Sequence, residues 1–186
     1  MEWEKLFEGL AVCAALAGAW TDVRTHRIPN RLTLSWGLAG LALHLVLGGA
    51  AGLADGGVRG LLPGVSAGLA WTLAGFAAAL PSLLLWLLGA LKAGDIKLYM
   101  AAGLIGGWKF CLGMEVYSVL IGGIAAAAVM ASRRSGRRAL KRLWLYGLTL
   151  LLTRRFVMYQ GDSESYFSYG CMIAAGAMAA ALRPLF

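Results

Sequence analysis

Residues 61–91 read LLPGVSAGLAWTLAGFAAALPSLLLWLLGAL and contain no Asp, Glu, Lys or Arg. As a single helix at ~1.5 Å per residue, this run would measure roughly 46 Å, which exceeds the ~30 Å hydrocarbon core of a bilayer. The run therefore predicts either one tilted and kinked membrane helix or two short helices that turn back. Pro63 suits a first helical turn, and Pro81 predicts a kink because it removes a backbone hydrogen bond.

The rest of the chain has the same membrane character. Of its 186 residues, 60% are hydrophobic and 14% are charged, whereas globular domains carry ~25% charged residues. At ~20 apolar residues per crossing, this length allows about six helices and no separate soluble domain. We therefore predict a single integral-membrane domain, residues 1–186, with an all-α fold: a polytopic transmembrane helix bundle of about six spans.

Apolar runs on both sides of residues 61–91 supply the other predicted spans. A Gly-rich connection is expected at 52–60, and a further apolar piece at 143–153 is flanked by bases. At roughly 16 Å this piece is too short to cross, so we predict a short interfacial amphipathic helix there. The acidic start of the chain lacks a basic leader, so the first span is expected to be retained. The five flanking spans are 6–21, 32–51, 98–112, 116–131 and 166–182.

Small residues inside these spans have structural explanations. The pairs Gly64-x-x-x-Gly68 and Gly103-x-x-x-Gly107 allow helices to approach closely. The three cysteines lie inside apolar segments without a C-x-x-C pair, which indicates packing residues rather than disulfide or metal ligands.

Positive charge orients the predicted bundle. The chain has 17 Lys and Arg against 9 Asp and Glu. In a soluble protein this excess would suggest a nucleic-acid partner, but in a membrane protein it marks the cytoplasmic loops. Every charged residue of 132–142, SRRSGRRALKR, is basic, so we place that segment in the cytoplasm. If residues 61–91 cross once, the loops at 22–31 and 92–97 lie on the same side, and both termini lie outside.

Two acids are candidates for chemistry. Asp22 and Asp95 each lie where an apolar run meets a predicted cytoplasmic loop, so the topology brings both to the same face at similar depth. Acids at membrane depth are costly and usually face the bundle interior. Two facing carboxylates cannot both ionise easily, and a pair that shares one proton can activate water for hydrolysis.

Two alternatives remain open for these acids. Each acid can pair with a local base, Asp22 with Arg24 or Arg27 and Asp95 with Lys97, in which case both acids are structural. Acids at membrane depth also serve ion pathways, which suggests a small transporter or proton relay. Against that second alternative, neither acid lies in the middle of an apolar run.

Motifs around the two acids carry a family resemblance. Asp22 precedes Ile28-Pro29-Asn30 by six residues, and Asp95 lies within the stretch AGDIKL at 93–98. In this order, the two motifs resemble those of the bacterial prepilin peptidases, which are membrane aspartic proteases of the GxGD type. A weaker similarity is the stretch YGCMIAAG at 169–176, which follows Ser168 where the family has a proline.

The resemblance implies a six-helix aspartic endopeptidase of the bacterial cytoplasmic (inner) membrane. Such an enzyme cleaves the short basic leader of type IV pilin-like precursors on the cytoplasmic side, just before their hydrophobic segment. It needs no metal or organic cofactor and has no nucleic-acid partner. The chain resembles the short form found with tight-adherence pili, for which methyltransferase activity is not expected. The catalytic aspartates match Asp22 and Asp95, and the supporting motif positions match Gly94, Ala93, Lys97, Pro29 and Asn30.

One position departs from the family pattern. Lys92 stands where the family has the first glycine of G-x-G-D. Its ammonium either favours ionised Asp95 from within ~4–6 Å or extends to the lipid headgroups. The departure also suggests a catalytically impaired member that acts in pilus assembly. Gly94 is retained, and its missing side chain is expected to leave room for a substrate backbone.

Neighbouring residues have ordinary explanations. Asn30 is expected to cap the following helix, and Pro29 to set an extended approach to it. His26 is expected to be a solvated loop residue, and His44, within the second span, a packed neutral ring.

Overall fold

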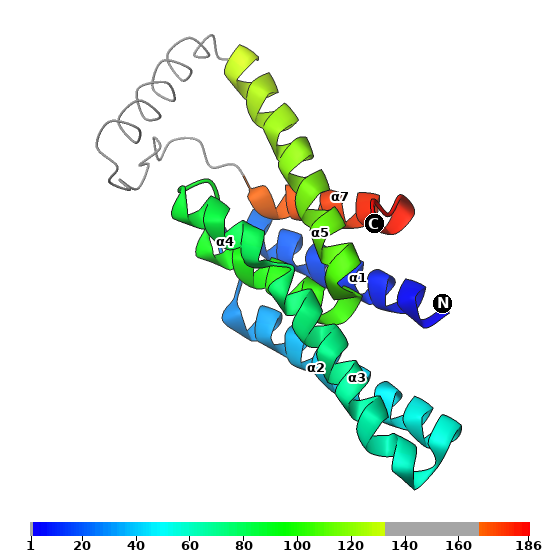
Figure 1. Ribbon diagram of the computed structural model, residues 1–186. Coiled ribbons are helices and arrows are strands. Elements are labelled where there is room, and N and C mark those ends of the chain that lie inside the picture. The colour runs from blue at the N-terminus through cyan, green and yellow to red at the C-terminus, as the bar shows by residue number, and fades with distance from the viewer. Residues whose placement is uncertain (1, 133–167) are drawn as a thin grey trace, which may run out of the picture.

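The computed structural model describes residues 2–132 and 168–186, which form a bundle of helices (Figure 1). Four helical segments are long and apolar enough to cross a membrane, and a shorter apolar helix, α7, accompanies them. The predicted all-α membrane bundle is confirmed at this level. The helices are α1 (Glu2–Thr25), α2 (Asn30–Gly56), α3 (Val58–Ala77), α4 (Leu80–Leu87), α5 (Ala93–Ser132) and α7 (Tyr169–Leu182).

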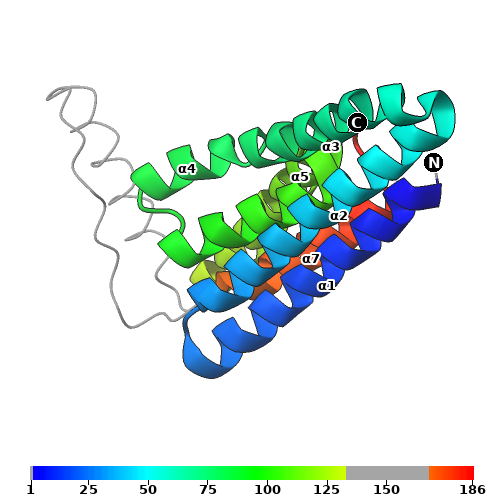
Figure 2. The ribbon, with the colours of Figure 1, turned by 90° about the horizontal axis from the view of Figure 1, so that it is seen from below.

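The turn between α2 and α3 is shorter than predicted. The Gly-rich stretch 52–60 is almost entirely helical, because α2 continues to Gly56 and α3 begins at Val58. Gly57 alone reverses the chain, with a φ of 59° that glycine adopts without steric cost. The predicted loop at 52–60 is therefore wrong, and α2 and α3 lie side by side up to their ends (Figure 2).

The charge-free run 61–91 crosses the bundle in one direction. After α3 ends at Ala77, α4 begins at Leu80 and continues toward the same end (Figure 2). Pro81 lies in the first turn of α4, where a missing N–H leaves no helical bond unmade. Pro63 lies inside α3 rather than in its first turn as predicted, because α3 already begins at Val58.

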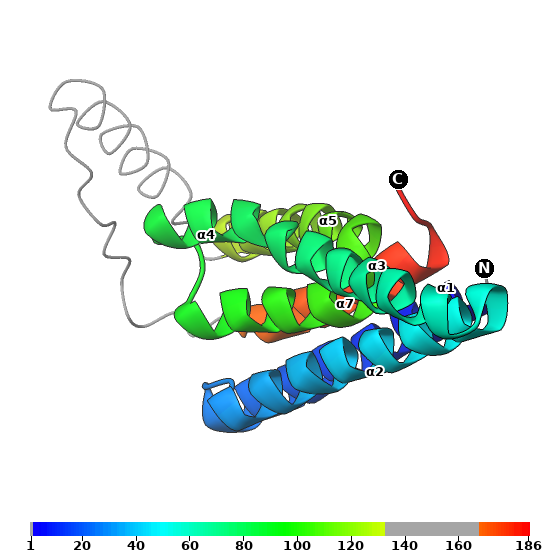
Figure 3. The same ribbon diagram turned by 60° about the horizontal axis from the view of Figure 1, so that its bottom comes forward.

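Helix α5 is a hairpin of two legs. Gly107 has non-helical dihedral angles (φ 79°, ψ 179°), and the chain reverses there (Figure 3). The Sγ atom of Cys111 lies 3.7 Å from the carbonyl oxygen of Tyr99, two positions that a straight helix would separate by roughly 18 Å. The sequence placed this turn near 113–115. That prediction is wrong, and Glu115 lies buried in the second leg instead.

Glycines allow the helices to touch backbone to backbone. A Cβ atom added at Gly64 would collide with the carbonyl oxygen of Gly48, and one at Gly68 would also strike the α2 backbone. Gly75 of α3 and Gly103 of α5 face each other in the same way. The predicted packing role is confirmed for Gly64, Gly68 and Gly103, since no larger residue fits these contacts, whereas Gly107 forms the turn of α5.

The two ends of the bundle differ in charge. The α1–α2 and α4–α5 connections lie at one end, and the N-terminus and the Gly57 turn lie at the other (Figure 2). The first end carries the bases of 24–31 and 92–97, as the predicted orientation requires. The basic run 133–142 and the predicted interfacial helix 143–153 lie outside the described residues.

We predict that Gly64→Leu lowers the stability of the bundle by about 1–3 kcal/mol, because the new side chain forces α2 and α3 apart. Thermal unfolding of the purified protein in detergent measures the change. Gly123→Leu is the matched control, since no atom of residues 2–132 or 168–186 lies within 4 Å of a Cβ atom at that helical position. Equal unfolding temperatures for the two variants would contradict the close contact.

Candidate active site

Asp22 lies in the last turn of α1 and is only 4% exposed. Its Oδ2 atom accepts a hydrogen bond from the Ser168 hydroxyl at 2.6 Å and one from the Gly170 backbone N–H at 3.2 Å. These donors form the N-terminus of α7, where unpaired N–H groups and the helix dipole favour an anion. The start of α7 therefore fixes the carboxyl group of Asp22.

The end of α1 is set one turn beyond Asp22. His26 adopts a positive φ of 52°, and its backbone N–H donates to the carbonyl oxygen of Asp22 at 2.8 Å. A left-handed residue in this place is a common way to terminate a helix. The chain then turns into the Ile28-Pro29-Asn30 loop, so the carboxyl group of Asp22 stays close to the end of the bundle.

Asp95 lies in the first turn of α5 and is 2% exposed. Its Oδ2 atom accepts a hydrogen bond from the backbone N–H of Lys92 at 2.9 Å. An acid at the third helical position that bonds back to the residue before the helix forms half of a capping box. The turn from Lys92 to Asp95 thus holds the second carboxyl group in place.

The two acids line one cavity of about 210 Å³ at the end of the bundle. Asp22 and Asp95 also interact electrostatically there. They come from α1 and α5, and the loops that follow α1 and precede α5 complete the walls. The full lining comprises Asp22, His26, Arg27, Ile28, Asn30, Lys92, Gly94, Asp95 and Lys97.

The local ion pairs that would make these acids structural do not form among the described residues. Instead, the guanidinium of Arg24 lies 4.3 Å from the ring centroid of Trp20. Lys97 Nζ donates to Asn30 Oδ1 at 2.8 Å, which joins α5 to α2. Both carboxyl groups are instead held by backbone N–H groups and one hydroxyl.

The structure brings some of the predicted supporting residues to the cavity and leaves others outside. Gly94, Lys97 and Asn30 line it, whereas Pro29 and Ala93 do not. Pro29 has the predicted extended backbone (φ −65°, ψ 136°) and is itself the residue before α2. The prediction that Asn30 caps α2 is wrong, because Asn30 is the first residue of that helix and its side chain accepts from Lys97.

Gly94 connects the two motifs. A Cβ atom at Gly94 would come within 3.3 Å of Ile28 Cβ, closer than ordinary van der Waals contact. Buried Ile28 thus occupies space beside Gly94 that we expected a substrate backbone to use. The glycine allows the loop after Asp22 to approach the helix that carries Asp95.

Lys92 and His26 both border the acids. The side chain of Lys92 is exposed and lines the cavity, and its charge acts on Asp95. His26 is exposed, as predicted, and lines the cavity as well. His44 is a packed ring, as predicted, with Nε2 2.8 Å from the carbonyl oxygen of Ile105 and its ring centroid 4.1 Å from that of Phe7.

A second group of buried polar residues was not predicted from the sequence. Glu115 is 6% exposed and interacts with Ser82 of α4, and Tyr99 is fully buried near Ser118 and Tyr169. The predicted spans 98–112 and 116–131 leave Glu115 in a connection between them. Its signal was an acid within a long apolar stretch, which usually indicates a side chain that faces the bundle interior.

Fold and site together define an all-helical membrane protein with a pair of buried carboxyl groups at one end of its bundle. Residues 9–129, more than half of the chain, match the type IV leader peptidase family. The chain belongs to this family and is an aspartic endopeptidase by that membership. Comparisons with curated proteins and with solved structures found no match.

We predict that Ser168→Ala lowers stability by about 1.5–3 kcal/mol, because the Asp22 carboxyl group loses its hydroxyl donor. Thermal unfolding in detergent measures the loss, and Ser35→Ala, which removes an exposed hydroxyl, is the control. In an Asp22→Asn background the cost of Ser168→Ala should shrink. An unchanged cost in that background would show that the hydroxyl does not act through Asp22.

Proposed function

We propose that this protein is a leader peptidase that removes the basic leader of type IV pilin-like precursors, with Asp22 and Asp95 as its catalytic pair. One observation carries the proposal: two buried carboxyl groups from separate helices line the same cavity in a chain of this family. Gly94, Lys97 and Asn30 shape that cavity, and Pro29 and Ala93 set the two chain segments that enter it.

The proposed chemistry needs one proton shared by the pair. The charged carboxylate takes a proton from a water molecule as the water oxygen attacks the scissile carbonyl carbon. The protonated carboxyl group donates its proton to the carbonyl oxygen, which gives a neutral tetrahedral diol. As the diol collapses and the C–N bond breaks, the protonated acid gives its proton to the leaving amine nitrogen. The other carboxylate takes a proton from a diol hydroxyl, so the acid pair again holds one proton.

The hydrogen bonds at the site suit this scheme because they fix both acids without neutralising them. Ser168 and Gly170 hold Asp22, and the Lys92 backbone N–H holds Asp95. Donors of this kind restrain a carboxyl group in one orientation, so that the water position between the two acids is preorganised.

We further propose six membrane crossings, with the acids at the cytoplasmic face of the bacterial inner membrane. Six crossings result when the two legs of α5 are counted separately and α3 and α4 are counted together. The first leg, 93–106, is roughly 21 Å long, so its turn lies below the far surface of the bilayer. Trp71 packs against Gly107 and covers that turn, as irregular backbone at membrane depth requires.

A second candidate function follows from Lys92. This lysine lines the acid cavity where the family pattern has glycine, which favours a member with impaired catalysis that acts in assembly of the pilus. We also propose that the peptidase is of the short form found with tight-adherence pili. No observation on the described residues favours the transporter alternative over either.

We predict that Asp22→Asn and Asp95→Asn each abolish leader removal from a co-expressed pilin-like precursor, since an amide neither accepts nor donates the transferred proton. Gel mobility and product mass report the cut. Asp55→Asn is the matched control, because Asp55 is an exposed acid near the Gly57 turn at the other end of the bundle. Leader removal by both active-site variants would reject the assignment.

We predict that Lys92→Gly raises the turnover number several-fold if Lys92 impairs catalysis, because the charge beside Asp95 disappears. Lys109→Gly, which alters a base outside the cavity, controls for loss of charge alone. Steady-state cleavage of the purified precursor distinguishes an impaired peptidase from a fully active one. Turnover that falls or stays constant in Lys92→Gly would favour the fully active peptidase.

A further inference from the structure

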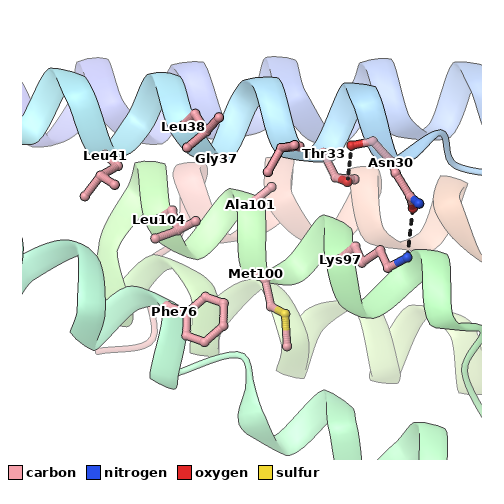
Figure 4. Close-up of a pocket in the computed structure, with 11 residues that line it drawn as sticks. Asn30, Thr33, Gly37, Leu38, Leu41, Phe76, Lys97, Met100, Ala101 and Leu104 are labelled. Atoms are coloured by element: carbon pink, nitrogen blue, oxygen red, sulfur yellow. Dashed lines mark hydrogen bonds between the residues drawn. The ribbon is translucent and has the colours of Figure 1, made fainter.

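A second cavity, the α2–α5 groove, adjoins the acids. It has a volume of about 320 Å³ and lies between α2 and the first leg of α5, with Phe76 of α3 at its side (Figure 4). Its polar side chains, Asn30, Thr33 and Lys97, lie together at one end (Figure 4). The remaining lining is apolar.

The α2–α5 groove adjoins the acid cavity and shares two lining residues with it. Asn30 and Lys97 line both, and Lys97 Nζ donates a hydrogen bond to Asn30 Oδ1 at 2.8 Å (Figure 4). An occupant that extends from the acids into the groove therefore passes first a polar and then an apolar surface. Its own chemistry must change from polar to apolar in the same direction.

The length of the groove suits the apolar face of one helix. From Asn30 to Leu41, α2 extends roughly 16 Å, or about three helical turns. Gly37 and buried Ala101 form a low floor, whereas Leu34 and Leu38 are more than half exposed and stand beside it. Small residues flanked by larger ones allow a second helix to approach closely.

A bilayer favours such an occupant over lipid. Lipid chains are as apolar as leucine, so helices associate in membranes through close packing rather than through loss of contact with water. The backbone of a helix can come closest to α2 and α5 at Gly37 and Ala101, which pack against each other. A flexible acyl chain would have to lose conformational freedom to fill the same surface.

We propose that the α2–α5 groove binds the apolar segment of the precursor on the far side of the scissile bond. This inference rests on the proposed function, because it takes the acid cavity as the place of cleavage. Binding of three apolar turns in the groove holds the polar–apolar junction of the substrate next to Asp22 and Asp95. The groove thereby selects where the chain is cut.

We predict that Leu38→Trp, which fills the groove, raises KM for a full-length precursor at least five-fold and leaves kcat within two-fold. Leu120→Trp is the control, since Leu38 and Leu120 are 55% and 57% exposed and Leu120 lies outside the groove. Cleavage of the purified precursor in proteoliposomes gives both constants. An unchanged KM for Leu38→Trp, or an equal rise for both variants, would overturn the proposal.

Disulfide crosslinking tests the same contact without a cut. The enzyme carries Asp95→Asn and has Cys13 and Cys171 replaced by alanine. To this background we add Leu38→Cys or, as the control, Leu120→Cys. The precursor carries one cysteine in its apolar segment. Oxidation should link the precursor to position 38 and not to position 120. Absent crosslinking, or equal crosslinking at positions 38 and 120, would overturn the proposal that the groove binds the precursor. Failure of the unmodified enzyme to cleave the precursor would reject the proposed function alone.

Discussion

Burial of two carboxyl groups at one end of an apolar bundle is the constraint on which the rest of the structure depends. Asp22 is satisfied by Ser168 and Gly170, which follow it by more than a hundred residues in sequence. This contact ties α1 to α7 and places the N-terminus of a helix against an acid. Asp95 is satisfied within its own turn, by the backbone N–H of Lys92. One acid therefore depends on the tertiary fold, and the other depends on local helix capping.

Glycine contacts bring these helices close enough for the cavity to form. Gly75 and Gly103 join α3 to the first leg of α5, and Gly94 lets Ile28 pack beside Asp95. Small residues also form the floor of the α2–α5 groove, where Gly37 lies next to Ala101. Acid cavity and groove are thus two parts of one surface, because small residues both tighten the bundle and leave room for a partner helix.

Membership in the type IV leader peptidase family explains why an acid cavity and an apolar groove would lie next to each other. A peptidase for membrane-bound precursors must accept a chain that is polar on one side of the cut and apolar on the other. The acid cavity and the groove offer these environments in sequence along α2. Lys92 adds a positive charge beside Asp95, where the family motif has glycine.

The sequence by itself determined the helical membrane class, the candidate acids and the end of the bundle at which they lie. Hydrophobic run length, the distribution of bases and the motif spacing each report a local property of the chain, and a local pattern is enough for these conclusions. The turn at Gly107, the burial of Glu115 and the contact between Asp22 and α7 were decided by the tertiary structure alone. Each depends on which helices lie side by side. Apolar residues of similar size permit many helix pairings, and backbone contact at particular glycines selects among them.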